Sequence, residues 1–290
     1  MLGLSTSQAV ARCSRGLASA DIDEARLEAE LLVGEVVGRG REWLFLHPDE
    51  QLTPEQSARL NSLLARRLKR EPLPYLLGRA EFYGLSFRAT PAAIIPRPET
   101  EILVEAAVAR AGRGRAHLAV DVGTGGGAMA VVLAKQIPTL RVVAVDVSLD
   151  ALRLTRENCE AHGVAQRVHL VCSDLLDGIS GEFDWVVANL PYCCNDEFPN
   201  LQPEVRDFEP RRALDGGPDG LALIRRLGGQ LLGHLRICGF AALEVGAGQA
   251  QEVAKLLGSA GLSAIEVLRD YAGIERVVIG WRDGGKGQER

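Results

Sequence analysis

Apolar residues after about residue 100 follow a pattern that limits the possible folds more than any other feature of the chain. Short runs typical of buried strands alternate there with longer runs of helical periodicity. The expected strands are 117–122, 141–147, 168–172, 183–188, 240–245, 263–269 and 276–281, and the expected helices are 102–110, 128–136, 149–162, 221–235 and 249–257. This alternation predicts an α/β fold with a parallel sheet covered by helices on both faces. Only a short link joins the last two strands, so we expect one of them to run antiparallel.

The first 75 residues lack this alternation and predict a small bundle of helices. Residues 5–17 place apolar side chains at helical spacing, and Asp23 is positioned to cap a second helix. Thr53, Pro54 and Gln56 together form a helix start, with threonine as the N-cap and glutamine three residues later. This part holds no nucleophile–base pair and no metal cluster, so we expect the chemistry elsewhere and no metal site.

A turn signal and a series of prolines separate the two patterns. Gly84 lies between Phe82 and Phe87 in a run that predicts a β-hairpin, and prolines punctuate the chain up to Pro98. We therefore expect a helical domain at 1–78, a hairpin linker at 79–95, an α/β domain at 96–282 and a disordered tail at 283–290.

Charge and cysteine usage restrict the classes of function. The net charge is −5, and residues 1–90 carry equal numbers of acidic and basic side chains. Because counterion release supplies most of the affinity for duplex phosphates, this balance argues against a stable nucleic-acid complex. The six cysteines show no metal-ligand spacing, which favours reduced thiols in the cytoplasm. The sequence shows neither a basic leader with an apolar core nor the ~20 apolar residues of a membrane span.

A cluster of basic residues decorates the helix that starts at Thr53. It comprises Arg59, Arg66, Arg67, Lys69 and Arg70. Such a cluster could dock an acidic protein or RNA, but we favour a solvated helix face, which is the usual reason for a charge run.

A glycine-rich turn lies between the first expected strand and helix of the α/β domain. Residues 123–127 read Gly-Thr-Gly-Gly-Gly, and Asp146 ends the next strand, where a carboxylate can accept both hydroxyls of a ribose. The run also fits a relaxed NAD-binding pattern. Asp121 would be poorly placed beside a diphosphate but suits a cationic ligand, which favours S-adenosylmethionine. After the third strand, Asp174 can accept from an adenine amino group and Leu175 can contact its ring.

The run Asn189-Leu190-Pro191-Tyr192 follows the fourth expected strand and suggests a reaction. The NH₂ group of an amide or an adenine is a weak nucleophile, because its lone pair is delocalised. Asn189 Oδ1 and the Leu190 carbonyl oxygen can accept its two N–H bonds, Pro191 stiffens the turn, and Tyr192 can stack on the planar group. The nitrogen would then be aimed at the methyl carbon, so positioning and nearby acceptors supply the catalysis without a strong general base.

With these motifs in place, the chain resembles the S-adenosylmethionine-dependent methyltransferases, and more narrowly the peptide chain release factor glutamine N5-methyltransferases (the PrmC/HemK family). The resemblance covers about residues 5–281. Its most specific stretch is 95–101, Ile-Pro-Arg-Pro-Glu-Thr-Glu. Further matching stretches are 74–78, 82–87, 121–127, 189–192, 209–210, 214–217, 219–221, 243–246 and 270–273.

The resemblance implies a fold, a cofactor and a substrate. The expected fold is a seven-stranded Rossmann-like methyltransferase domain with an N-terminal helical bundle and a hairpin link. The expected reaction moves a methyl group from S-adenosylmethionine, leaving S-adenosylhomocysteine, to the glutamine of the Gly-Gly-Gln motif of class 1 release factors. The helical domain would dock that partner, and we expect a cytoplasmic monomer that does not associate with membranes.

The family pattern also assigns residue roles. The catalytic residues would be Asn189, Pro191 and Tyr192. The cofactor-binding residues would be Asp121, Gly123, Thr124, Gly125, Gly126, Gly127, Asp146, Asp174, Leu175 and Asn189. The substrate-binding residues would be Asn189, Leu190, Pro191, Tyr192, Arg97 and Glu99. Arg97, Glu99 and Glu101 would shape the floor of the site, although a role of the glutamates at a helix N-terminus is an equal interpretation.

Three departures from the family pattern leave alternatives open. Leu190 stands where the family usually has proline, a form shared with ribosomal RNA adenine dimethyltransferases. Gly126 replaces a frequent serine. Cys193 and Cys194 stand where an aliphatic residue is common, and we favour small apolar packing over redox control.

Other functions remain alternatives to release factor methylation. They are a ribosomal-protein glutamine methyltransferase, a nucleic-acid adenine N6-methyltransferase, and an NAD-binding module, which would leave the Asn189 turn unexplained. The chain's own Gly-Gly-Gln at 228–230 lies in an expected helix, so we interpret it as a coincidence rather than a self-methylation site.

Overall fold

The computed structural model describes residues 4–111 and 117–284 and contains two compact units. The helical unit contains the chain up to Arg79 together with Gln202–Phe208. The α/β unit contains Ala80–Leu201 and the chain from Glu209 onward. Of the expected tail at 283–290, residues 285–290 lie outside the described residues.

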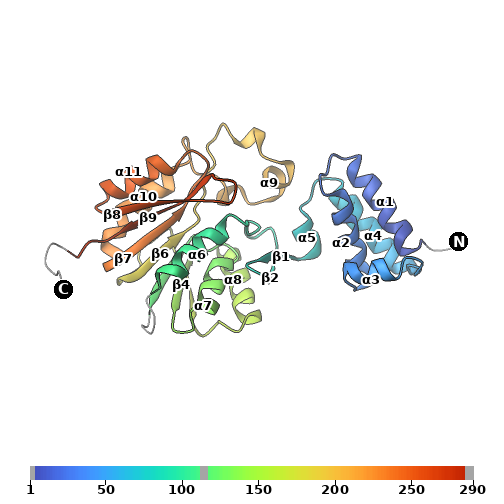
Figure 1. Cartoon of the computed structure of the whole chain (residues 1–290), viewed down its shortest axis with the longest axis horizontal. Helices are drawn as coiled ribbons and strands as arrows, with labels where there is room; N and C mark the ends of the chain where they lie inside the picture. Colours follow the sequence, from blue (N-terminus) through green and yellow to red (C-terminus); the bar gives the residue numbers. More distant parts are fainter. Residues whose placement is uncertain (1–3, 112–116, 285–290) are drawn as a thin grey trace. The chain divides into compact units, whose positions relative to one another are not determined.

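The helical unit consists of short helices around an aliphatic core. Its helices are α1 (Thr6–Ala18), α2 (Ala25–Val37), α3 (Arg41–Leu46), α4 (Pro54–Arg67), α5 (Leu73–Leu77) and α9 (Pro203–Phe208) (Figure 1). Side chains from α1, α2 and α4, among them Leu17, Leu32 and Leu60, are fully buried in one cluster. No pattern in the sequence predicted that a segment from beyond residue 200 would join this unit.

Two capping boxes set where helices of this unit begin. Ser5 accepts from the backbone of Gln8, and Thr53 accepts from that of Gln56, while each glutamine side chain bonds back to the cap. Each box satisfies two backbone N–H groups that the helix leaves free. The prediction that Asp23 caps the second helix is wrong, because α2 begins one residue after Glu24 and no side chain caps it.

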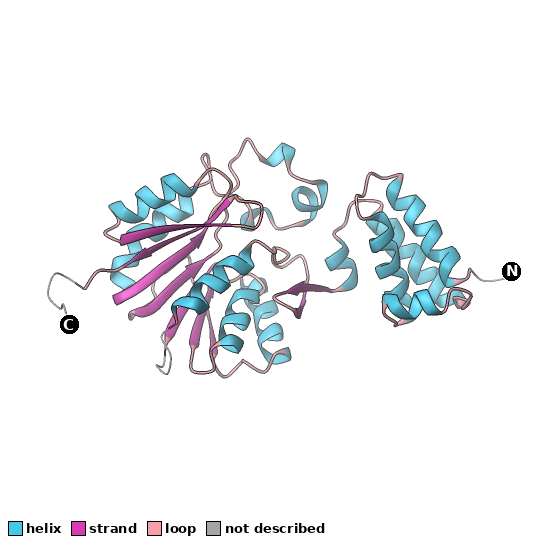
Figure 2. Ribbon diagram, in the orientation of Figure 1, coloured by secondary structure: helices cyan, strands magenta, loops and turns pink. Residues whose placement is uncertain are grey.

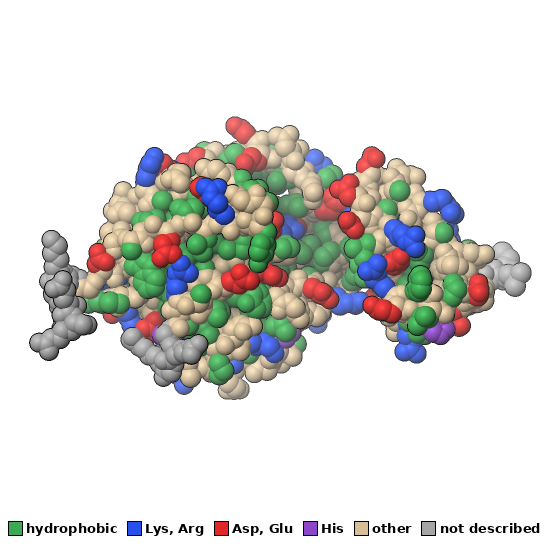
Figure 3. All heavy atoms as spheres, in the orientation of Figure 1, with side chains coloured by type: hydrophobic (Ala, Val, Ile, Leu, Met, Phe, Trp, Pro, Cys, Tyr) green, Lys and Arg blue, Asp and Glu red, His purple; other side chains and the backbone are tan. Residues whose placement is uncertain are grey.

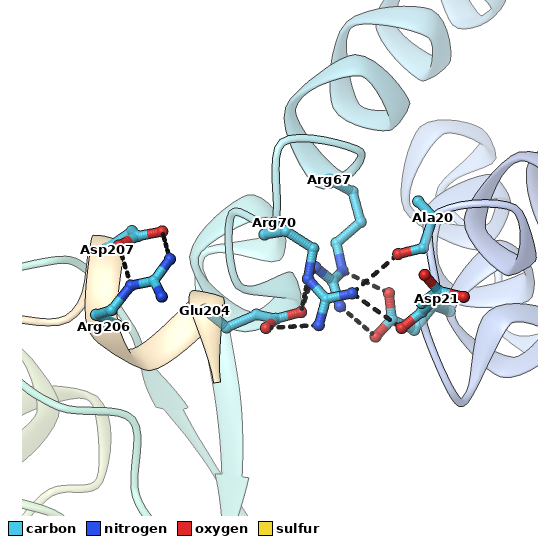
Figure 4. A network of polar contacts seen from close by, with 8 residues as sticks. Ala20, Asp21, Arg67, Arg70, Glu204, Arg206 and Asp207 are labelled. Atoms are coloured by element: carbon cyan, nitrogen blue, oxygen red, sulfur yellow. Dashed lines mark hydrogen bonds and ion pairs between the residues drawn. The ribbon is translucent and has the colours of Figure 1, made fainter. Parts of the chain in front are cut away.

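Arg67, at the end of α4, does not lie on the solvated face that its neighbours suggested. Its side chain is 5% exposed and pairs with Glu28 at 2.6 Å and with Glu204 of α9 at 2.9 Å. Arg70 also binds Glu204 and donates to the carbonyl oxygens of Ala20 and Asp21 (Figure 4). The charges in this part of the cluster are therefore satisfied within the helical unit.

The α/β unit opens with the expected hairpin. Strands β1 (Arg79–Phe82) and β2 (Leu85–Arg88) are joined by Tyr83 and Gly84, both at positive φ, which is the conformation of a type I′ turn. Phe82 and Phe87 are buried in the core of the α/β unit, with ring centroids 6.2 Å apart.

A seven-stranded sheet follows the hairpin, in the order β5-β4-β3-β6-β7-β9-β8. Its strands are β3 (Leu118–Val122), β4 (Arg141–Asp146), β5 (Val168–Cys172), β6 (Phe183–Ala188), β7 (Leu235–Glu244), β8 (Ser263–Arg269) and β9 (Glu275–Trp281). The first five in the order are parallel, and β9 runs antiparallel to both β7 and β8. The seven-stranded α/β fold and the antiparallel end are thus confirmed.

Helices cover both faces of this sheet, as Figure 2 shows with strands in magenta and helices in cyan. The helices are α6 (Thr100–Arg110), α7 (Ala128–Gln136), α8 (Leu149–Ala161), α10 (Ala222–His234) and α11 (Ala250–Ser259). Two short 3-10 turns, Phe198–Asn200 and Arg211–Ala213, lie between β6 and α10. Alternate residues of β3 separate into the two cores, since Ala119 packs with α6 and α7 and Val120 packs with α10 and α11.

The distribution of surface charge and the length of the helices can also be compared with what the sequence predicts. On the face drawn in Figure 3, acidic and basic side chains are interspersed over both units. Among the described residues, no helix is both long and apolar enough to cross a membrane.

Candidate active site

The predicted site residues follow neighbouring parallel strands, so they meet at one edge of the sheet. The glycine turn follows β3, Asp146 ends β4, Asp174 comes shortly after β5, and Asn189 follows β6. The chain proceeds from β3 through β4 to β5 on one side and then returns to place β6 on the other side of β3. A crevice at such a reversal is where open α/β sheets bind ligands.

Backbone hydrogen bonds hold the glycine turn against the end of β4. Gly123 N and Thr124 N donate to the Val145 carbonyl oxygen at 2.8 and 2.9 Å. Gly125 N donates to Asp146 Oδ2 at 2.9 Å, and Ser148 N donates to Asp146 Oδ1 at 2.8 Å. The Asp146 carboxylate is therefore fixed beside the turn, and each oxygen keeps a lone pair for a ligand hydroxyl.

Gly127 is the point where this turn requires glycine. Its φ is +79°, and a Cβ there would lie 2.5 Å from Thr155 Cγ2 of α8. The residue also starts α7, whose first turn would otherwise be pushed away from α8. The sequence pattern thus reports helix packing at this position as well as ligand access.

Asp121 is fully buried at the end of β3, directly before the turn. Thr124 Oγ1 donates to its Oδ2 at 2.7 Å, and Oδ1 has no hydrogen-bond partner among the described residues. Burial raises the pKa of Asp121 to about 7, the Thr124 hydroxyl opposes that rise, and the nearby Asp146 charge adds to it. A cationic group close to this carboxylate would favour its charged form, so the residue fits a sulfonium cofactor.

The acceptor element, Asn189–Tyr192, lies next to the glycine turn. A Cβ on Gly123 would be 3.0 Å from Leu190 Cδ2 and 3.7 Å from the Asn189 carbonyl oxygen. Asn189 Nδ2 donates to Thr100 Oγ1 at 3.0 Å. Within the described ranges, no donor is bonded to Asn189 Oδ1 or to the Leu190 carbonyl oxygen. The structure thus brings together the turn expected to bind the cofactor and the oxygens expected to bind the acceptor.

Tyr192 completes this element as a half-buried side chain. Burial and the Glu244 charge raise the pKa of its phenol to about 12. Its carbonyl oxygen accepts from Gln249 Nε2 at 3.0 Å. The phenol therefore stays neutral at physiological pH and can act as a planar apolar surface.

The two residues expected at the adenine differ in burial, since Asp174 is exposed and Leu175 is buried. Asp174 is about half exposed, and its Oδ2 accepts from Arg226 Nη2 at 2.8 Å. Leu175 is 6% exposed and has a positive φ, with its side chain in the core under α10. An adenine contact at Asp174 would therefore use the other carboxylate oxygen or displace Arg226.

The 95–101 stretch is tied to the Glu209 carboxylate and to the Tyr83 backbone. Arg97 Nη2 binds Glu209 Oε1 at 2.5 Å, and burial raises the pKa of Glu209 while the Arg97 charge lowers it. Glu99 is the N-cap of α6 without a side-chain cap bond, and Glu101 accepts from the Tyr83 backbone N–H at 2.7 Å. Glu101 thus fixes the hairpin turn, and Glu209 is a partner that sequence reasoning missed.

Sequence reasoning also missed Thr100 and Glu244, which lie around Asn189. Glu244 is 2% exposed at the end of β7, and one of its oxygens, Oε2, has no partner among the described residues. The available signal was a glutamate closing an otherwise apolar strand, which needs a reason because a buried charge is costly.

Three further observations concern a surface groove, an internal motif, and metal and cysteine chemistry. A groove of about 390 Å³ is lined by Arg88–Ala92 and one face of α8, and none of the predicted site residues lines it. The internal Gly-Gly-Gln motif at 228–230 lies inside α10, so the prediction that it falls in a helix is confirmed. Among the described residues no cluster suited to a metal ion occurs, and the six cysteines are free.

Comparison with known proteins identifies the family and the fold. A family model described as the PrmC N-terminal domain matches residues 8–78, and one described as the methyltransferase small domain matches residues 98–200. The chain is similar to proteins named release factor glutamine methyltransferase from Geobacter sulfurreducens, at 42% identity over 265 residues (91% of this chain, 92% of the relative), and Moorella thermoacetica, at 41% identity over 277 residues (95% and 98%).

Among solved structures, a methyltransferase from Pyrococcus furiosus is similar at a TM-score of 0.54 and 19% identity, over 80% of this chain and 100% of that one. That likeness shows the fold alone. The α/β unit is accordingly an S-adenosylmethionine-dependent methyltransferase domain. Identity above 40% over nine-tenths of both sequences carries the assignment further: the chain belongs to the family of release factor glutamine methyltransferases.

Proposed function

We propose that this protein methylates the side-chain amide nitrogen of the glutamine in the Gly-Gly-Gln motif of class 1 peptide chain release factors. The observation that carries the proposal is the orientation of Asn189, whose Nδ2 is bonded inward to Thr100 beside the glycine turn. Its Oδ1 is thereby left as an acceptor for an N–H group. The names of the relatives from Geobacter sulfurreducens and Moorella thermoacetica support the same substrate.

The residues around the glycine turn fit the cofactor by charge and hydrogen bonding. S-adenosylmethionine, when bound, supplies an electrophilic methyl group on a positively charged sulfur. Asp121, with its unpartnered Oδ1, favours a cationic ligand, and Asp146 offers lone pairs to ribose hydroxyls. We assign Thr124 and the glycines 123–127 to the same subsite, where Thr124 holds Asp121 through its hydroxyl.

The acceptor element then positions the glutamine amide. Asn189 Oδ1 and the Leu190 carbonyl oxygen each accept one N–H bond, so the nitrogen lone pair points out of the plane toward the methyl carbon. Tyr192 covers the planar amide and excludes water, and Pro191 restricts the turn. As the new N–C bond forms, the bond between the methyl carbon and sulfur would break, and its electron pair would stay on the sulfur of S-adenosylhomocysteine. Positive charge grows on the nitrogen, and the two oxygens stabilise it before a proton leaves to solvent.

Arg97 and Glu99 are assigned to the acceptor side of the site. The Arg97–Glu209 pair is largely buried, so it can hold the 95–99 segment in one conformation. Glu99 contributes negative charge near Glu244. We place Asp174 and Leu175 at the adenine, with Leu175 as the apolar contact.

Competition between candidate acceptors tests the proposal. The protein is incubated with radiolabelled S-adenosylmethionine and equal amounts of a purified class 1 release factor, a ribosomal protein and ribosomal RNA. We expect label in the release factor and its loss when the Gly-Gly-Gln glutamine is replaced by alanine. Label in the ribosomal protein or the RNA instead would replace this assignment with one of the other two methyltransferase functions.

The helical unit provides the second part of the proposal, because it is matched by the PrmC N-terminal domain model and carries no residue assigned to the chemistry. We infer that it docks the release factor. We further infer that the protein acts in the cytoplasm. We also infer that it acts as a monomer, since the turn and the acceptor element come from one unit of one chain. Light scattering after gel filtration measures the molar mass in solution and so tests whether the protein is a monomer.

A further inference from the structure

Glu244 is a buried acid that the proposed reaction leaves without a role. It lies at the carboxyl end of β7, and its carboxyl group is 2% exposed with one unpartnered oxygen. Burying a carboxylate is costly, so its presence at the site needs a compensating interaction.

The sheet places Glu244 beside the acceptor element. Ala188 of β6 pairs in register with Leu243 of β7, so the next residues, Asn189 and Glu244, leave the sheet side by side. Thr100, the first residue of α6, is 7% exposed and accepts from Asn189 Nδ2 at 3.0 Å. The Thr100 hydroxyl and the Asn189 amide both stabilise the charged form of Glu244 through hydrogen bonding.

The direction of these hydrogen bonds is set by their ends. An ionised carboxylate can only accept, so Thr100 donates its hydrogen to Glu244 and accepts from Asn189. Asn189 must then turn its NH₂ end inward and its Oδ1 outward. If the Asn189 amide were rotated by half a turn, its Oδ1 would face the Glu244 carboxylate, and two acceptors would repel each other. Its NH₂ group would then face the NH₂ group of the substrate glutamine, and two donors would meet.

We propose that Glu244, acting on the Asn189 amide directly and through Thr100, is a positioning residue that holds Asn189 with its oxygen toward the substrate amide. The inference rests on the proposed function, because it deepens the role given there to Asn189. In this proposal the orientation of the Asn189 amide is fixed by its hydrogen-bond partners before the substrate binds, and not by the rotamer preference of asparagine.

The protonation of Glu244 gives this device a pH dependence. Burial raises its pKa to about 7, Glu99 at the start of α6 adds to that rise, and Arg276 of β9 lowers it. Arg276 is itself paired with Asp270, and the neutral Tyr192 phenol also faces the carboxyl group. Above this pKa the carboxylate enforces one amide orientation, whereas the protonated acid can donate and tolerates both.

Glu244→Gln and two variants of Thr100 test the relay by kinetics. Glu244→Gln and Thr100→Val are expected to lower kcat for release factor methylation about tenfold, while the Kd of S-adenosylhomocysteine by calorimetry stays unchanged. Thr100→Ser keeps the hydroxyl and should restore the rate. The acid limb of the kcat profile, near pH 7 in the unmodified protein, should disappear in Glu244→Gln.

A matched control separates positioning from general damage to the sheet. Asp184 is a second buried acid, near the other end of β6, where it accepts from Leu118 N and pairs with Arg236. Asp184→Asn should lower the melting temperature without changing the pH profile of kcat. If Asp184→Asn and Glu244→Gln change the kinetics alike, the positioning role is wrong.

A measurement without turnover keeps this inference distinct from the proposed function. In protein carrying ¹⁵N-asparagine, the side-chain NH₂ signals of Asn189 should shift as the pH passes through about 7. The shift should be absent in Glu244→Gln. Signals that do not respond to pH in the unmodified protein overturn the relay, whereas a failure to methylate any release factor overturns the function alone.

Discussion

Asn189 has a neutral amide whose two ends differ only in hydrogen bonding, so its usefulness depends on which end faces the acceptor. Thr100 Oγ1 accepts from the NH₂ end at 3.0 Å, and Glu244 is hydrogen-bonded to both Thr100 and the Asn189 amide. An acceptor oxygen fixed in this way needs no reorganisation as charge develops on the attacking nitrogen. The orientation of the Asn189 amide is therefore set by two neighbouring side chains, Thr100 and Glu244.

Replacing Asn189 by alanine should remove one of the two acceptors without disturbing the glycine turn. We expect kcat to fall about a hundredfold or more, in line with the loss of one preorganised polar group at a reacting centre. The affinity for S-adenosylhomocysteine, measured by calorimetry, should change little. The matched control is Asn200→Ala, which removes an exposed amide bonded only weakly to the Asp196 carbonyl; equal losses in the two variants would contradict the role.

Asp121 should make cofactor affinity depend on pH. Its pKa in the free protein is about 7, and a cationic ligand nearby favours the charged form, so binding releases a proton. Affinity should therefore fall as the pH drops through about 7, by up to about tenfold for each unit by which the ligand lowers the pKa. Calorimetry of S-adenosylmethionine across this range measures the effect, and Asp121→Asn should give a flat profile. A slope that persists in that variant would assign the titration to another group.

Turns and short helices decide how these side chains are presented. The 123–127 turn is held by β4 on one side and by Thr155 of α8 on the other. In the helical unit, α9 is a six-residue helix whose anchors are the ion pairs of Glu204 (Figure 4). Both elements depend on close contacts that a single substitution can remove.

Gly127→Ala should destabilise the α/β unit more than a glycine substitution in open space. Gly127 and Gly163 both have positive φ, at +79° and +70°, so alanine is strained at either position. Only at Gly127 would the new Cβ meet a neighbour within 3 Å, and such overpacking costs roughly 1–3 kcal/mol beyond the strain. Urea unfolding of the two variants gives the comparison. Equal midpoints would show that α8 can move away from the new Cβ without loss of stability.

Glu204→Gln should loosen α9 within the helical unit. Arg67 would keep Glu28 but lose its second partner, and Arg70 would lose its carboxylate. Loss of charged hydrogen bonds is worth about 1.5–3 kcal/mol, so the backbone amide hydrogens of residues 204–208 should exchange faster with deuterium. Glu71→Gln, whose partner Arg66 is 49% exposed, should change exchange little. Unaltered exchange in Glu204→Gln would mean that α9 is held by other contacts.

Across the chain, the sequence was informative where one physical requirement dominated. Buried strands and helices must alternate to build a parallel sheet, and the glycine turn needs positive φ, so both were predictable. Asp23 failed as a cap because Ser, Thr and Asp residues occur at many loop positions, and nothing local selects among them. The start of β7 at Leu235 rather than residue 240 was missed because Arg236 and Gly239 interrupt its apolar pattern.

Long-range partners were beyond any local pattern. Arg67 and Glu204 are separated by more than a hundred residues, so the burial of the arginine could not be inferred from the helix that carries it. The same holds for Thr100, Asn189 and Glu244, which come from three elements and meet only in the folded sheet. Motif spacing therefore located the acceptor oxygen but not the groups that orient it.

The identity of the methylated atom is the decisive question for the whole protein. A class 1 release factor incubated with this protein and S-adenosylmethionine can be digested and its Gly-Gly-Gln peptide fragmented in a mass spectrometer. The expected result is one added methyl group on the side-chain nitrogen of that glutamine, absent when Asn189→Ala replaces the unmodified protein. A methyl group on any other residue, or an unmodified peptide under conditions where the cofactor binds, would contradict the account.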